Sequence, residues 1–257
     1  MSSDVRVDLN EAVMTVTLDR PSKKNAITAE MYAAMANAIE KAQADTGVNA
    51  VFLRGEGGNF TSGNDIGLFV SSDQSEHKTS PALPFLTAIL ALKKPLVACV
   101  RGHAVGIGAT VLLHCDYVVA SDDARLRFPF VDLGLCPEFA STLLLQNIVG
   151  RSKATEWLLL GTPIAAAEAL RAGLVNSVMS ADLAEEEALS IAKRLAAKPQ
   201  GALRATRELI RGDVSESPSA RIVRESAVFD ALRRSDEAQV IFKRFLDRSA
   251  ETVAQRS

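Results

Sequence analysis

The chain has 257 residues, 47% of them apolar, so it can bury the core of one large domain or of a core with a small appendage. Its 29 basic and 31 acidic residues give a net charge of −2, which excludes a broad basic surface for nucleic acid. We read no signal peptide, membrane span or targeting signal in it, and we therefore expect a cytoplasmic protein without a membrane partner.

The first strands are predicted from alternating apolar and polar residues, and the first helix from its N-cap residue. Segments 5–9 and 13–18 alternate apolar and polar residues, which predicts two strands joined by a turn at Asn10-Glu11. Thr28 is the expected N-cap of a helix that runs to about Asp45. Further strands are expected over 49–54, 95–100, 116–120 and 175–178.

The remaining segments have helical periodicity or loop composition. Residues 71–80 are polar and loop-like. Helices are expected over 84–92, 108–114, 138–148, 152–160, 165–172, 182–197, 199–211 and 218–248. Strands thus alternate with helices first and helices follow alone, which predicts an α/β core over 1–195 and a C-terminal helical region over 196–257.

The cysteines and histidines argue against metal or disulfide chemistry. The three cysteines are irregularly spaced in apolar surroundings, which predicts buried reduced thiols: Cys99, Cys115 and Cys136. The three histidines form no metal-ligand spacing, so no metal site is expected: His77, His103 and His114.

Two glycine-bearing loops could aim backbone N–H groups at one oxygen. In the first, Gly63 permits a tight turn and the residues after it could begin a helix with unpaired N–H groups. An ordinary turn capped by Asn64 or Asp65 is the alternative interpretation. The second loop, 102–108, follows a buried strand and precedes a helix. A dinucleotide loop is its rival interpretation, but Val111 stands where a third glycine would be needed.

Donors from both loops that converge on one carbonyl oxygen would form an oxyanion hole. A covalent serine mechanism is poorly supported, because the chain has no Gly-x-Ser-x-Gly elbow. Glu138 could move a proton beside the loops, although it could also be a first-turn helix acid after Pro137. Asp132 is a weaker candidate on the other face of an extended segment, and Asp65 and Asp116 are interpreted as a cap and a strand-end residue.

Several motifs together resemble the crotonase, or enoyl-CoA hydratase/isomerase, superfamily over nearly the whole chain. They are Asn25-Ala26-Ile27, Phe60 to Ile66, Lys94-Pro95 through Asp116, Phe128-Pro129, and Ala169 to Val175. The resemblance implies a crotonase-like α/β spiral of ββα units with a C-terminal helical trimerisation region. It also implies an acyl-CoA thioester substrate, no separate cofactor, and assembly as a homotrimer or a dimer of trimers. The N–H groups of Asn64 and Ile107 would hold the thioester oxygen as an enolate forms.

Departures from the hydratase pattern narrow the implied reaction. Hydratases that resemble this chain carry two glutamates, where this sequence has Thr110 and Phe130. The run from Leu133 to Glu138 instead resembles the Δ3,Δ2-enoyl-CoA isomerases of the peroxisomal type. One carboxylate of raised pKa is enough to move a proton from C2 to C4 of an acyl chain, which gives Glu138 the acid/base role.

The resemblance also suggests contacts to the substrate and its CoA, while plain solvation is the alternative for the lysines. The candidates are Lys23, Lys24, Ala26, Ser62, Gly63, Asp65, Ile66, Gly106, Thr110, Phe130, Pro137, Lys243 and Phe245. One alternative function is an enoyl-CoA hydratase or another thioester-enolate enzyme with non-standard catalytic residues. An alternative of another class is a crotonase-fold binding protein of low activity, for example an RNA-associated one. Acids are interspersed among the arginines of the C-terminal helices, which favours a solvated surface instead.

Overall fold

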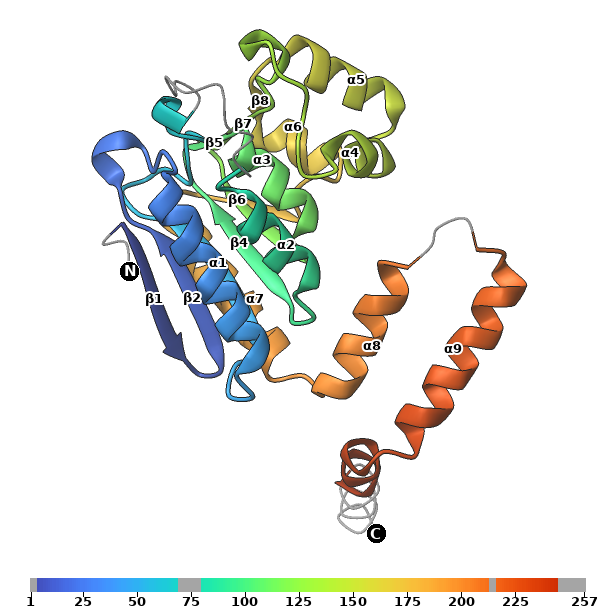
Figure 1. The fold of residues 1–257 in the computed structure, drawn as a ribbon. Coiled ribbons are helices and arrows are strands. Elements are labelled where there is room, and N and C mark those ends of the chain that lie inside the picture. Colours follow the sequence, from blue (N-terminus) through green and yellow to red (C-terminus); the bar gives the residue numbers. More distant parts are fainter. Residues whose placement is uncertain (1–3, 69–79, 213–215, 245–257) are drawn as a thin grey trace. The chain divides into compact units, whose positions relative to one another are not determined.

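The computed structural model describes residues 4–68, 80–212 and 216–244, which form a mixed α/β fold (Figure 1). Contacts divide the chain into two compact units, Met1–Ala196 and Ala197–Ser257. The first unit holds every strand of the described residues, and the second is helical where it is described. The expected polar loop over 71–80 lies outside the described residues except for its last position.

Within the described residues, the central sheet has the strand order β1-β2-β3-β4-β6-β9. β1 is antiparallel to β2, and each later strand runs parallel to its neighbour. The strands are β1 Val5–Asn10, β2 Val13–Leu18, β3 Ala50–Gly55, β4 Leu96–Val100, β6 Tyr117–Ser121 and β9 Ser177–Met179. Each expected strand is present with its ends shifted by no more than about two residues, a normal uncertainty for element boundaries.

Both faces of this sheet are covered, which explains its almost continuous apolar strands. On β3, Val51 and Leu53 belong to the core cluster that includes helices α1 (Ala29–Ala44) and α2 (Leu83–Ala91). Phe52 belongs to a second cluster, which includes residues of α7 (Ala184–Ala196). Helix α7 covers the face of the sheet opposite α1 and α2 (Figure 1). Thr28 caps α1 as expected, because its side chain accepts a hydrogen bond from the Met31 N–H.

A second, three-stranded sheet was not predicted. β5 (His103–Val105) pairs in parallel with β7 (Arg125–Arg127), which pairs antiparallel with β8 (Ile164–Ala165). Strands of two or three residues are too short to show alternation, so the sequence carries no periodic signal for them. Gly102, at φ +53°, turns the chain from β4 into β5 and so starts the second glycine-bearing loop.

The helices near this small sheet differ in detail from the expected ones. The buried helix expected over 108–114 begins one residue earlier, as α3, and tightens into a 3-10 turn, η3. The helix expected over 138–148 begins at Ser141, because Phe139 and Ala140 have left-handed backbone angles of φ +57° and +55°. The helices and turns are α3 Ile107–Thr110, η3 Val111–His114, η4 Val131–Leu133, α4 Ser141–Val149, α5 Arg151–Leu160 and α6 Ala166–Arg171.

The helical unit contains α8 (Gln200–Ile210) and α9 (Pro218–Arg233). The single helix expected over 218–248 is wrong, because α9 ends at Arg233 and a new helix covers 236–244. Ser235 makes the break. Its hydroxyl donates to the Leu232 carbonyl at 2.7 Å and accepts from the Ala238 N–H at 3.2 Å, which ends one helix and caps the next.

The expectation of three buried thiols holds only for Cys99. Burial raises the pKa of the Cys99 thiol to about 11. Cys115 is half-buried and Cys136 is exposed. The apolar residues near Cys136 in the sequence are themselves exposed: Val131, Leu133 and Leu135. An apolar stretch of sequence therefore did not predict burial at this position.

Candidate active site

The two glycine-bearing loops lie against each other. Thr61 and Ala104 form a parallel β-bridge between them. A Cβ added to Gly63, at φ +93°, would lie 2.9 Å from the Val105 carbonyl oxygen. A Cβ added to Gly108 would lie 2.4 Å from Cγ2 of Thr61. Glycine at these two positions therefore allows an approach that any side chain would block.

Each loop offers a backbone donor. Asn64 forms a parallel β-bridge with Ile27, and the residues on either side of Asn64 make its hydrogen bonds. The Asp65 N–H donates to the Ile27 carbonyl at 2.9 Å, and the Ile27 N–H donates to the Gly63 carbonyl at 2.9 Å. The N–H of Asn64 itself is left on the other side of its strand. Ile107 is the first residue of α3. Among the described residues, no acceptor is recorded for the N–H of Asn64 or of Ile107. Two unpaired donors on adjoining loops are what an oxyanion hole requires.

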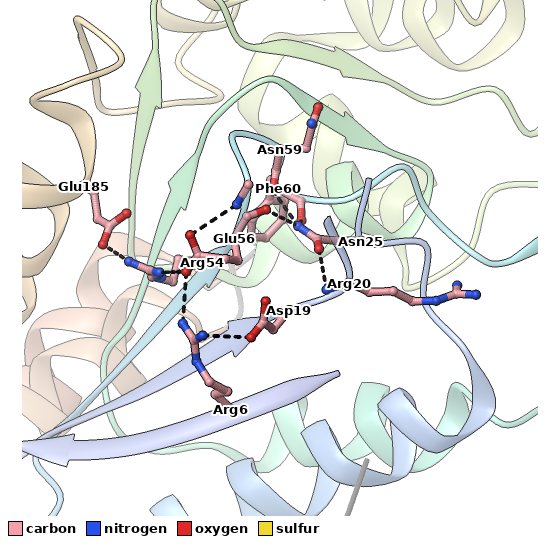
Figure 2. Close-up of polar contacts among 10 residues, drawn as sticks. Arg6, Asp19, Arg20, Asn25, Arg54, Glu56, Asn59, Phe60 and Glu185 are labelled. Carbon is pink, nitrogen blue, oxygen red and sulfur yellow. Dashed lines mark hydrogen bonds and ion pairs between the residues drawn. The ribbon is translucent and has the colours of Figure 1, made fainter. Parts of the chain in front are cut away.

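A buried asparagine fixes the chain that leads to the first loop (Figure 2). Asn25 is fully buried, and its Nδ2 donates to the carbonyl of Asn59 at 2.7 Å. Its Oδ1 accepts from the Arg20 N–H at 2.8 Å, and its carbonyl accepts from the Thr61 hydroxyl at 2.6 Å. Further Nδ2 bonds go to the carbonyls of Glu56 and Phe60. This one side chain therefore holds loop 20–26 against loop 56–61.

Four of the residues expected to contact CoA lie together on these loops. The carbonyl of Lys24 accepts from the Ser62 N–H at 2.9 Å, and the carbonyl of Ala26 accepts from an Arg20 Nη at 3.0 Å. Arg20 also pairs with the carboxylate of Asp65 at 2.7 Å. The hydrogen bond from Arg20 holds the pKa of Asp65 below its usual value. Asp65 also accepts from the Gly67 N–H at 3.0 Å, so it has the capping role that we expected.

Glu138 lies in the loop before α4, and not in the first turn of that helix. Its Oε1 is buried and has no hydrogen-bond partner. Burial raises the pKa of the Glu138 carboxyl above its ordinary value. Its backbone carbonyl accepts from the Ser141 N–H at 3.0 Å and from the Ser141 hydroxyl at 2.6 Å. The main chain of Glu138 is thus fixed while its carboxylate is free to accept a proton.

His114, the last residue of η3, holds this loop against the helical segment that begins at Ile107. Sequence reasoning did not predict this role. The Nε2 of His114 lies 2.9 Å from the Phe139 carbonyl, and the two rings stack with their centroids 3.8 Å apart. These contacts hold Phe139 in its left-handed conformation, which costs free energy in a residue other than glycine. No local pattern links residues that are 25 positions apart, so the pair could not be predicted from the sequence.

Tyr32 joins the acid to the first loop, and it too was missed. Its hydroxyl donates to Oδ1 of Asn64. Burial raises the pKa of Tyr32 above its ordinary value, and the charge of Glu138 raises it further. Glu138 and Asn64 therefore lie within electrostatic reach of the same buried hydroxyl group. The buried hydroxyl of Tyr32 thus links the candidate acid/base and a candidate oxyanion donor.

The positions of the missing hydratase glutamates are buried and uncharged. Thr110 lies one turn after Ile107, and its hydroxyl contacts the Ile107 carbonyl at 3.4 Å. Phe130 is buried in the same core cluster as Phe139. Neither position offers a carboxylate that could hold a water molecule.

The other predicted residues have mixed surroundings. Gly106, at φ +58°, directly precedes α3, and Pro137 is half-buried beside Glu138. Ile66 is 60% exposed. Lys243 is exposed on the helix over 236–244, and Phe245 lies outside the described residues.

The two remaining acids are structural. Asp132 is exposed in η4 and pairs with Arg127 at 3.0 Å, so its expected place in an extended segment is wrong. This 3-10 turn closes on Gly134 at φ +70° and is too short to show a helical period in the sequence. Asp116 accepts from the Leu96 N–H at 2.8 Å at the end of two neighbouring strands, as expected.

No group of three or more His, Cys, Asp or Glu side chains in the described part of the chain is arranged to hold a metal ion. In the same residues, every helix is too short or too polar to cross a membrane.

Known proteins resemble this chain over almost its whole length. The family described as enoyl-CoA hydratase/isomerase matches residues 8–255. The 2,3-dehydroadipyl-CoA hydratase of Escherichia coli K12 is 30% identical, with 96% of each chain covered. Enoyl-CoA delta isomerase 2 of Rattus norvegicus is 36% identical over 92% of this chain and 61% of its own length.

Solved structures agree with these relatives. A protein of Magnetospirillum magneticum AMB-1, named in the enoyl-CoA hydratase/carnithine racemase group, has a TM-score of 0.92 and 37% identity, covering 96% of this chain and 97% of its own. The OdaA protein of Pseudomonas aeruginosa has a TM-score of 0.78 and 39% identity, covering 95% and 99%. The chain therefore belongs to the enoyl-CoA hydratase/isomerase family, within the crotonase superfamily that its motifs resemble.

Proposed function

We propose that this protein is an enoyl-CoA isomerase that converts 3-enoyl-CoA into 2-enoyl-CoA, with Glu138 as its acid/base. The observation that carries the proposal is the buried carboxylate oxygen of Glu138, which has no hydrogen-bond partner. Glu138 lies within electrostatic reach of Tyr32, whose hydroxyl donates to the side chain of Asn64. A single carboxylate suits a proton shift, whereas hydration uses a second carboxylate to position water, and the expected hydratase positions hold Thr110 and Phe130.

The reaction would proceed in two proton transfers. The ionised Glu138 takes a proton from C2 of the 3-enoyl chain, and the electron pair of that C–H bond delocalises into a dienolate. The N–H groups of Asn64 and Ile107 donate to the thioester oxygen as it gains charge. Protonated Glu138 then returns the proton at C4, which leaves the double bond between C2 and C3 and restores the carboxylate. Neither step needs a cofactor, because substrate and protein supply every group.

The raised pKa of Glu138 suits both transfers. Burial disfavours the charged form, so the ionised carboxylate is a stronger base than that of an exposed glutamate. We expect kcat/KM to fall on the acid side as Glu138 becomes protonated, with an apparent pKa above the ordinary 4.5. The CoA part would lie along Lys24, Ala26 and Ser62, which the loop contacts bring together. Gly63, Gly106, Ile66 and Pro137 would line the path of the acyl thioester.

Replacing the acid tests the function directly. We expect Glu138→Gln to lower kcat for 3-enoyl-CoA by about 10²–10⁴-fold, the usual contribution of general acid–base catalysis. Binding of a saturated acyl-CoA, measured by calorimetry, should change by no more than about threefold, since the replaced group is not needed to hold CoA. Asp132→Asn is the matched control, because Asp132 is an exposed carboxylate six positions away that is paired with Arg127.

The alternative is a hydratase, which the similarity to the Escherichia coli 2,3-dehydroadipyl-CoA hydratase keeps open. A product screen over 3-enoyl-CoA, crotonyl-CoA and ring-bearing CoA esters distinguishes the two. Robust hydration of crotonyl-CoA by the wild type, or unchanged isomerisation by Glu138→Gln, would contradict our proposal.

A further inference from the structure

Tyr32 lies in the core of the first unit and yet ends at the active-site loop. Its side chain is fully buried, and its ring packs against Phe85 of α2 with the ring centroids 6.1 Å apart. From there the hydroxyl reaches Oδ1 of Asn64, 32 positions along the chain. The loop end is also fixed near the start of the same helix, since Asn64 bridges Ile27 and Thr28 caps α1. The packing of Tyr32 and the β-bridge of Asn64 therefore both fix the position of the Tyr32 hydroxyl relative to the Asn64 amide.

This contact leaves the other half of the Asn64 amide available. With Oδ1 engaged as an acceptor, the two donors on Nδ2 point away from Tyr32. Among the described residues, no acceptor is recorded for Nδ2, and it is not among the buried polar atoms that lack a partner. Asn64 is half-buried. An unpaired donor that water can reach is available to a bound ligand.

The hydroxyl of Tyr32 is the donor in the bond between the two side chains. The hydroxyl of Tyr32 stays protonated, because burial and the nearby charge of Glu138 both oppose its ionisation. It donates to Oδ1 of Asn64, so the amide presents its carbonyl oxygen to Tyr32. Without the hydroxyl, the Asn64 amide could turn over and present its oxygen, an acceptor, where a donor now stands.

We infer that Tyr32 is a positioning residue that holds the Asn64 side-chain amide as a third donor to the enolate oxygen, beside the N–H groups of Asn64 and Ile107. The inference rests on the thioester-enolate chemistry of the proposed function, and it does not depend on whether the product is an isomer or a hydrate. It assigns Asn64 two donors, one from its main chain and one from its side chain.

A double-mutant cycle tests this inference on the whole protein. Tyr32→Phe removes the hydroxyl, and Asn64→Ala removes the amide while it keeps the backbone N–H. The readout is the near-ultraviolet absorbance of the enolate of bound acetoacetyl-CoA, together with kcat for 3-enoyl-CoA. We expect Asn64→Ala to lower the enolate fraction by about 10²-fold, as for the loss of one oxyanion donor. Tyr32→Phe should lower it by about tenfold, because the amide is misoriented and not removed.

The double variant decides between a positioning role and an independent one. We expect it to be no worse than Asn64→Ala, since Tyr32 acts through an amide that is no longer there. Losses that multiply would overturn the inference. It would also be overturned by Tyr32→Phe weakening the binding of saturated butyryl-CoA as much as it weakens the enolate, because that result indicates a general distortion of the loop.

The second tyrosine supplies the control. Tyr117 lies in β6 and packs with the cluster on the α7 side of the sheet, so Tyr117→Phe should leave the enolate fraction unchanged. A wild type that binds acetoacetyl-CoA without forming enolate would contradict the inference as well. A wild type that forms enolate but isomerises no 3-enoyl-CoA would reject the proposed reaction and leave the Tyr32 cycle measurable.

Discussion

One oxygen of the Glu138 carboxylate, Oε1, is buried without a hydrogen-bond partner, and this arrangement costs stability whenever the group is charged. Because burial raises the pKa of Glu138 in the folded state, the folded protein binds this proton more tightly than the unfolded chain does. Stability from this residue is therefore fully present below the unfolded pKa of about 4.5 and is lost as the pH rises through the folded pKa.

We therefore expect Glu138→Gln to raise the melting temperature at pH 8 while it lowers kcat for 3-enoyl-CoA. At pH 5 the gain should be smaller, since wild-type Glu138 is then partly protonated. Calorimetric unfolding of both proteins at the two pH values measures the difference. Asp132→Asn should show no such gain, because its charge is exposed and paired. A Glu138→Gln protein that is less stable than the wild type at pH 8 would contradict the expected cost of the buried charge.

Sequence reasoning named its candidate residues from motifs. Asn64 and Ile107 were proposed through the resemblance of the two glycine-bearing loops to the family, and Glu138 through that resemblance and its place after Pro137. Tyr32 and His114 were not named, because their partners lie 32 and 25 positions away and are met only through tertiary packing. The roles of the first three residues stay predictions until the variants are measured.

At the scale of elements, the site depends on how closely two loops approach. Gly108 sits in α3 against Thr61, where an added Cβ would lie only 2.4 Å from Cγ2 of Thr61. We expect Gly108→Ala to move α3 and its Ile107 donor, and to lower kcat by about 10²-fold, the cost of a displacement near 1 Å. Initial rates on 3-enoyl-CoA, with far-ultraviolet circular dichroism to check folding, provide the measurement.

A second change tests whether steric overlap is the cause. Thr61→Ser removes Cγ2 but keeps the hydroxyl, which donates to the Asn25 carbonyl at 2.6 Å and accepts from the Gly63 N–H at 3.0 Å. Adding Thr61→Ser to Gly108→Ala should restore part of the activity, because the Thr61 carbonyl, at 3.3 Å from the added Cβ, still crowds it. A combined variant that is as slow as Gly108→Ala alone would indicate another reason for the loss.

Element prediction succeeded where a segment was long enough to show its period. The strands of the central sheet have five or more residues, apart from the three-residue β9. Helix α1 begins at a clear N-cap. The small sheet of β5, β7 and β8 was missed, although β5 carries the chain from the core to the Ile107 donor. Its strands are held by pairing between distant segments, which no single stretch of sequence reveals.

At the scale of the whole molecule, the helical unit exposes large apolar side chains that a lone chain would not favour. On α9, Phe229 is 67% exposed, and Ile222 lies on the same side two turns earlier and is also exposed. Exposed apolar patches of this kind mark interaction surfaces. They support the expectation that a second and third copy of the chain bind here, in a homotrimer or a dimer of trimers.

An acidic substitution on this face tests the assembly. We expect Phe229→Asp to shift the protein toward the monomer, because a buried, unpaired carboxylate would oppose association. Ala227→Asp is the matched control, since residue 227 is also exposed on α9 but lies two positions away and so points to nearly the opposite side. Sedimentation equilibrium gives the masses of both variants and of the wild type. Equal masses for the two variants would show that α9 does not assemble through Phe229, and a monomeric wild type would remove the predicted oligomer altogether.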